Sequence, residues 1–172
     1  GNRLKMMKVA VIGGGAAGFF AAIHAKENHP SAAVTIFEKS KKLLAKVKVS
    51  GGGRCNVTNG CTSISELSKA YPRGEKKMRK AFSVFNTKHT MEWFEKRGVA
   101  LTIQDDNCVF PVSQNSQTII DCFLNEARRL GVDIKTESPV IGLCPQESGA
   151  IELTFRPNSH GSENKAVFDK VI

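Results

Sequence analysis

The sequence predicts an α/β fold built on a parallel sheet, because three features follow one another near its start. A β-branched run at residues 8–12 (KVAVI) indicates a buried strand. The glycine turn at 13–18 (GGGAAG) follows at once, and an alanine- and phenylalanine-rich segment at 16–26 indicates a helix. A second apolar run at 33–37 completes a strand–helix–strand unit, in which the two strands lie parallel.

The glycine turn has the spacing G-x-G-x-x-G, which is typical of a Rossmann-like dinucleotide-binding site when a strand precedes it and a helix follows. Gly13 allows the tight turn, Gly15 leaves room for a pyrophosphate, and Gly18 lets the helix pack closely on the strand. The helix N-terminus offers unpaired N–H groups and a partial positive charge to the phosphates. A turn that only connects a strand to a helix is the alternative, which the complete context disfavours.

Glu38 directly follows the second predicted strand, twenty residues after Gly18. An acidic residue at this place can accept hydrogen bonds from both hydroxyls of the adenosine ribose. Its negative charge also disfavours a 2′-phosphate. The sequence therefore predicts FAD or NAD at this site, and not NADP.

The rest of the chain is predicted to hold a helical insertion and then a return to the sheet. The expected elements are helices at 63–70, 75–85 and 87–96, strands at 99–103 and 108–112 around a turn at 105–107, a helix at 116–130 ended by Gly131, a strand at 132–136, and an antiparallel meander at 140–144, 151–155 and 165–172. The last of these strands is the candidate to rejoin the parallel sheet. We expect three regions: 1–60 with the first βαβ unit, 61–115 with the insertion, and 116–172 with the helix, third parallel strand and meander.

Composition and residue spacing argue against a membrane-spanning protein, a disulfide-rich protein and a metal-binding protein. The chain has 172 residues and a formal net charge of +9, with no apolar stretch long enough for a membrane span. Its five cysteines include no C-x-x-C pair, and its four histidines lack metal-ligand spacing. We therefore expect reduced thiols, a cytoplasmic location and no metal site.

The positive charge is concentrated in two places. Basic residues cluster after the second predicted strand, from Lys39 to Arg54, and again from Lys76 to Lys80. No nucleic-acid-binding motif accompanies them. We interpret the charge as a solvated basic face and expect a small-molecule substrate with neither nucleic acid nor membrane as partner. The sequence does not predict the oligomeric state.

A second glycine cluster carries a family resemblance. Residues 48–59 (KVSGGGRCNVTN) resemble the hallmark of the BaiN-like family, which is also described as YhiN-type or aminoacetone-oxidase-like. The resemblance continues through 71–74 (YPRG), 93–99 (WFEKRGV) and 109–111 (VFP), and so covers nearly the whole chain. It implies a flavoprotein of the two-dinucleotide-binding-domain type, with a Rossmann-like FAD-binding domain. The implied activity is hydride transfer through the flavin, with NAD(P)H as donor and an organic substrate.

The resemblance also implies which residues bind FAD. Those expected at the pyrophosphate and adenosine are Gly13, Gly14, Gly15, Ala16, Ala17, Gly18, Glu38 and Lys39; those expected beside the flavin are Lys48, Ser50, Gly51, Gly52, Gly53, Arg54, Cys55 and Asn56. Three consecutive glycines let backbone N–H groups face phosphate or ring atoms without side-chain obstruction. No residue is predicted as the catalytic acid or base.

Two further hypotheses remain open. Cys55 and Cys61 would suit a flavin disulfide oxidoreductase, although five residues separate them instead of the four found in the glutathione-reductase type. A non-catalytic nucleotide- or RNA-associated module is the other. Because members of the resembled family are longer, we expect this chain to be an N-terminal fragment, truncated before the closing segments, with weakened FAD affinity and no turnover of its own.

Overall fold

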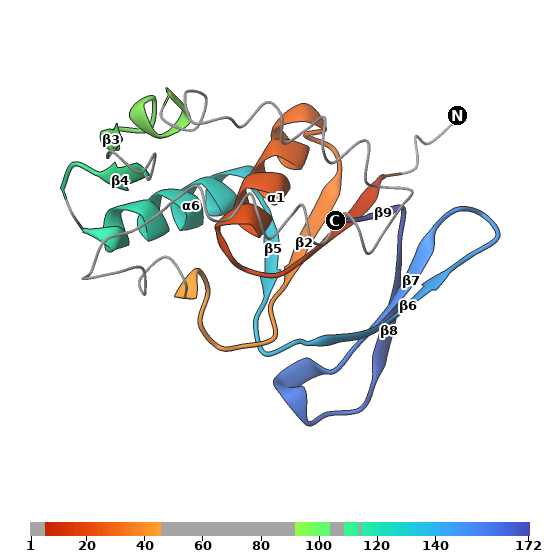
Figure 1. Cartoon of the computed structure of the whole chain (residues 1–172). Helices are drawn as coiled ribbons and strands as arrows, with labels where there is room; N and C mark the ends of the chain where they lie inside the picture. The colour runs from red at the N-terminus through yellow and green to blue at the C-terminus, as the bar shows by residue number, and fades with distance from the viewer. Residues whose placement is uncertain (1–5, 46–91, 104–108, 114) are drawn as a thin grey trace. The chain divides into compact units, whose positions relative to one another are not determined.

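The computed structural model describes residues 6–45, 92–103, 109–113 and 115–172 (Figure 1). These fall into two compact units, one formed by Gly1–Gly14, Gly18–Leu43 and Ala127–Ile172, the other by Gly15–Ala17 and Leu44–Glu126. The predicted helices at 63–70 and 75–85, the start of the helix at 87–96 and the turn at 105–107 lie outside the described residues. The division into three regions therefore stays a prediction.

A four-stranded parallel sheet forms the centre of the first unit. Its strands lie in the order β5-β2-β1-β9, with β1 at Lys8–Ile12, β2 at Ala33–Phe37, β5 at Asp133–Lys135 and β9 at Lys170–Val171. Helix α1 (Ala16–Asn28) connects β1 to β2. The predicted parallel sheet and its strand–helix–strand unit are confirmed.

An antiparallel meander covers one face of this sheet. Its strands are β6 (Val140–Pro145), β7 (Ile151–Phe155) and β8 (Asn164–Phe168), paired in that order. Phe37 of β2 packs between them, with its ring centroid 4.9 Å from Phe155 and 5.7 Å from Phe168. The predicted meander is therefore confirmed, and its Leu153, Phe155 and Phe168 form a buried cluster with Ala10, Phe37 and Val171.

The two inner strands, β1 and β2, are covered on both faces, which explains their continuous apolar runs. Ala10 and Ile12 of β1 pack in the same cluster as the meander. Val11 points to the other face, where its Cγ1 lies 3.5 Å from the position that a Cβ at Gly18 of α1 would take. Phe19 and Ile23 of α1 are fully buried as well.

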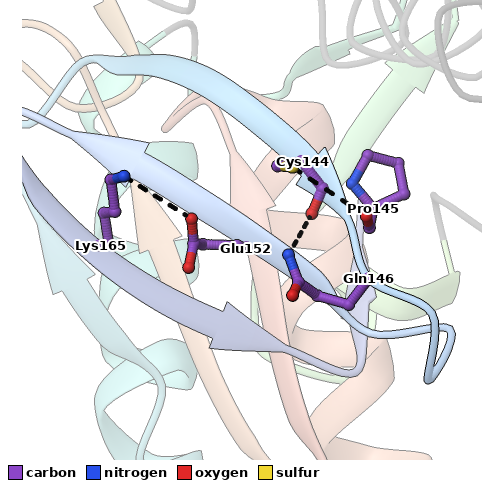
Figure 2. Close-up of polar contacts among 5 residues, drawn as sticks. All are labelled: Cys144, Pro145, Gln146, Glu152 and Lys165. Atoms are coloured by element: carbon purple, nitrogen blue, oxygen red, sulfur yellow. Dashed lines mark hydrogen bonds and ion pairs between the residues drawn. The ribbon is translucent and has the colours of Figure 1, made fainter.

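The outer side of the meander carries polar side chains (Figure 2) beside the exposed Val167. Glu152 of β7 and Lys165 of β8 form an ion pair with 3.9 Å between Oε1 and Nζ. Gln146 Nε2 donates to the Cys144 carbonyl oxygen at 3.1 Å. The thiol of Cys144 is therefore on the exposed surface of a sheet whose other side is core.

One predicted element requires correction. The run at 165–172 was expected to be a single strand, but it divides at Asp169 into antiparallel β8 and parallel β9. Asp169 exchanges bonds with the backbone of Lys8, because its N–H donates to Lys8 O and its Oδ2 accepts from Lys8 N, both at 2.8 Å. An apolar run does not reveal such a change of partner.

The second unit contains a small hairpin and the larger part of helix α6 (Ser116–Leu130). Strands β3 (Leu101–Ile103) and β4 (Val109–Pro111) pair antiparallel, as predicted. The α6 N-terminus is capped by Asn115, whose Oδ1 accepts from Gln117 N at 3.0 Å. The helix predicted at 116–130 is confirmed, and its Ile119 and Phe123 are fully buried.

Glycines end both helical segments in the same way. Gly98 has φ +81° and Gly131 has φ +77°. The next residue donates back across the last turn in each case, from Val99 to Phe94 O and from Val132 to Ala127 O, both at 2.9 Å. This pattern is the Schellman motif, and it confirms Gly131 as the predicted end of the helix at 116–130.

The described residues hold no helix that is both long and apolar enough to cross a membrane.

Candidate dinucleotide-binding site

The glycine turn between β1 and α1 requires glycine at two positions for steric reasons. Gly13 has φ +105°, and its N–H donates to Phe37 O at 2.7 Å, which extends the β1–β2 ladder. A Cβ at Gly18 would lie 1.9 Å from Gly13 O and 3.1 Å from Gly13 C, both backbone atoms. The helix therefore approaches the turn more closely than any other residue at position 18 would allow.

Gly14 and Gly15 differ in their surroundings. A Cβ at Gly14 would lie 2.8 Å from Leu43 Cδ2 and 3.1 Å from Glu38 Cβ, so this glycine packs against the chain that follows β2. The sequence analysis gave no reason for glycine there. At Gly15, no atom that the structure describes, beyond its chain neighbours, lies within 4 Å of such a Cβ. This open space beside the helix N-terminus is where a pyrophosphate is expected.

The Glu38 carboxylate links the glycine turn to the loop after β2. Its Oε1 accepts a hydrogen bond from Gly14 N at 3.0 Å. Its Oε2 accepts two, from Ser40 N at 2.6 Å and from Ser40 Oγ at 2.8 Å. The carboxylate is therefore held from both sides at the carboxyl end of a parallel strand, where dinucleotides bind in this class of sheet.

Glu38 stays ionised in this setting. Partial burial raises the pKa of its carboxyl group, but the N–H groups of Ser40 and Gly14, the Ser40 hydroxyl and the charge of Lys39 lower it. The net effect is a pKa below the usual value of 4.5. At neutral pH the group is thus a hydrogen-bond acceptor only.

The backbone of Glu38 is fixed as firmly as its side chain. Its N–H donates to Lys135 O, and its carbonyl oxygen accepts from Ser138 N, both at 2.8 Å. The next turn is held in the same way, since Glu137 N donates to Ser40 O at 3.0 Å. The segment after β5 therefore positions the loop that carries Glu38, a contribution that sequence spacing did not indicate.

The residues present fit the adenosine and pyrophosphate part of a dinucleotide. An ionised, partly exposed carboxylate lies next to a backbone N–H of the glycine turn, and the space at Gly15 is open. Ala16 and Ala17 are buried, so their methyl groups belong to the core. Lys39 is exposed. Contact of each of these residues with a cofactor stays a prediction.

The second half of the expected site cannot be placed. Its residues lie outside those that the structure describes: Lys48, Ser50, Gly51, Gly52, Gly53, Arg54, Cys55 and Asn56. Cys61 and Cys108 lie outside them as well. The structure thus brings together the adenosine side of the expected site, and the flavin side remains an expectation.

The two described cysteines are free thiols in different settings. Cys144 is exposed and Cys122 is buried. Burial raises the pKa of Cys122 to about 11; the Arg97 charge opposes this and the Glu126 charge adds to it. Cys122 is therefore an unreactive core residue. Among the described residues, no group of His, Cys, Asp or Glu side chains is arranged to hold a metal ion.

Comparison with protein families gives a match over residues 7–169, to the HI0933-like protein Rossmann domain. Two curated relatives share sequence with the chain. The 3-dehydro-bile acid delta(4,6)-reductase of Clostridium scindens is 30% identical over 131 residues, which are 76% of this chain and 31% of the relative. The ribosomal RNA dihydrouridine synthase of Escherichia coli is 28% identical over 144 residues, 81% of this chain and 33% of the relative. The chain thus spans about a third of the length of these relatives.

Solved structures share the fold at low identity. The THI4 protein of Thermovibrio ammonificans superposes with a TM-score of 0.59 at 11% identity, over 96% of this chain and 55% of that one. The S-allyl-L-cysteine S-oxygenase of Allium sativum gives 0.53 at 17% identity, over 96% and 35%. Together with the family match, these similarities confirm the predicted α/β class and a Rossmann-like domain.

Two glycine substitutions should separate folding from binding. Gly18→Ala places a Cβ against the carbonyl of Gly13, so we expect a loss of roughly 2 kcal/mol or more in the free energy of unfolding. Gly15→Ala meets open space, so we expect unchanged unfolding and about tenfold weaker FAD binding. Thermal unfolding and a fluorescence titration with FAD measure the two effects. Normal FAD affinity in Gly15→Ala would argue against a pyrophosphate at this turn.

Proposed function

Since the chain belongs to the HI0933-like protein family, we propose that the whole protein is a flavin-dependent oxidoreductase in which these residues bind FAD. The observation that carries this proposal is the Glu38 carboxylate, held beside the glycine turn by Gly14 and Ser40. In a domain of this type, that is the place of the adenosine ribose. The neighbouring open space at Gly15 supports a pyrophosphate next to it.

The residues of this chain would bind and orient the cofactor. Glu38 would accept hydrogen bonds from the ribose hydroxyls, and the N–H groups at the start of α1 would face the pyrophosphate. Bound FAD would supply hydride transfer to or from the substrate. We propose NAD(P)H as the electron donor, as implied by the resemblance of residues 48–59. The flavin-side loop Ser50–Asn56 belongs to this proposal on its sequence alone.

The names of the two relatives support an unsaturated organic substrate. One is named a delta(4,6)-reductase of a 3-dehydro-bile acid, and the other a synthase of dihydrouridine in ribosomal RNA. Each name describes the addition of hydrogen to an unsaturated compound. We propose the same reaction class here, in the cytoplasm, with the particular substrate unassigned. A disulfide reaction at Cys55 and Cys61 has no additional support among the described residues.

An absorption spectrum tests the FAD proposal. The purified chain is mixed with FAD, desalted and scanned for flavin bands, and its affinity is then measured by titration. Glu38→Gln removes the charge that the ribose hydroxyls would bind, so we expect about tenfold weaker binding or more. Glu137→Gln is the matched control, because it removes an equal charge from the adjoining loop. Equal affinity in both variants, or no flavin retained by a longer form of the protein, would overturn the proposal.

A second candidate is an RNA substrate for the same enzyme. Residues 46–91 contain ten Lys and Arg residues against two Glu, and so supply +8 of the chain's net +9. This charge and the rRNA-modifying relative are the two observations that support RNA as an alternative to a small molecule. Binding of a labelled uridine-containing RNA should weaken steeply as salt rises, with a uridine-free RNA of equal length as control. Absence of binding at low salt would leave the small-molecule substrate in place.

A further inference from the structure

The Ser40 hydroxyl has two acceptors within reach and one proton to donate. Its Oγ lies 2.8 Å from Glu38 Oε2 and 3.1 Å from Lys42 O. A hydroxyl group donates one hydrogen bond, so these two contacts are alternatives. The shorter distance and the negative charge favour the carboxylate while no ligand is bound.

The acceptor sites of Glu38 are nearly filled by the chain itself. An ionised carboxylate offers about four acceptor sites. Among the described residues, three donors use them: Gly14 N at Oε1, and the Ser40 N–H and hydroxyl at Oε2. A ribose that binds through both hydroxyls needs two sites, one more than this arrangement leaves.

We propose that Ser40 is a specificity-determining residue for the ribose. When a ribose with both hydroxyls binds, the Ser40 hydroxyl turns from Glu38 Oε2 to the carbonyl of Lys42 and frees the second acceptor site. This inference rests on the proposed function, in which Glu38 binds the adenosine ribose. The carboxylate keeps its position during the exchange, because both backbone donors, Gly14 N and Ser40 N, remain bonded to it.

The exchange makes the effect of Ser40 depend on the ligand. When a complete ribose binds, the Ser40 hydroxyl exchanges a charge-assisted hydrogen bond to Glu38 for a neutral one to Lys42. This exchange weakens the binding of the ribose slightly. A ribose that lacks one hydroxyl uses only the site left on Oε1 and requires no exchange. Loss of the Ser40 hydroxyl should therefore strengthen the binding of a complete ribose and leave the binding of a ribose that lacks one hydroxyl unchanged.

Calorimetric titration with FAD and with its 2′-deoxyadenosine analogue tests this pattern in the chain and in Ser40→Ala. We expect Ser40→Ala to bind FAD about fivefold more tightly and the deoxy analogue unchanged. Ser40→Thr keeps a hydroxyl and should match the original chain. Ser40→Gly provides a second variant without a hydroxyl, should Ser40→Ala fold poorly.

Other results would overturn the inference in distinguishable ways. Equal weakening of both ligands in Ser40→Ala would show that Ser40 only positions Glu38, and an unchanged affinity for both would show that its hydroxyl has no role. In either case the proposed function would stand, provided that Glu38→Gln still binds FAD more weakly than the original chain. If the original chain and a longer form bind neither ligand, the proposed function fails together with the inference.

Discussion

The carboxylate of Glu38 is the group on which the rest of the site depends. It joins the glycine turn after β1 to the loop after β2, through Gly14 N on one side and Ser40 on the other. These are the places where two adjacent parallel strands end, so one side chain bridges the two loops that follow them. The hydrogen bonds that hold it outweigh its partial burial, so it is held as an anion. An anion fixed in this way is prepared to accept ribose hydroxyls without rearrangement of the backbone.

The core explains why this carboxylate can be held so firmly. Strands β1 and β2 are buried on both faces, by α1 and by the meander, and Phe37 anchors the end of β2 between Phe155 and Phe168. Glu38 follows Phe37 directly. Its N–H donates a hydrogen bond to the carbonyl oxygen of Lys135, and its own carbonyl oxygen accepts one from the N–H of Ser138. The meander therefore stabilises the sheet face directly behind the site, although it contributes no residue that is expected to contact the cofactor.

Much of this arrangement could be predicted from sequence, because its signals are local. The β-branched run of β1, the glycine spacing and the acid after β2 all act within forty residues of one another. Ser40 and the packing reason for Gly14 could not be predicted, since both depend on where the chain turns after β2. The division at Asp169 was missed for a similar reason: its cause is a contact with Lys8, at the other end of the chain. A contact between distant parts of the chain leaves no hydrophobic periodicity in the sequence of either part, so it cannot be predicted from a sequence pattern.

The most direct test of this account is an NMR titration of the Glu38 carboxyl carbon, in the chain alone and with FAD. The account predicts a pKa below 4.5 in the chain alone, because the hydrogen bonds from Gly14 and Ser40 favour the charged form. With FAD bound, the ribose hydroxyls should lower the pKa further. A pKa at or above 4.5 that FAD leaves unchanged would contradict the claim that this carboxylate is the fixed anion of a dinucleotide site.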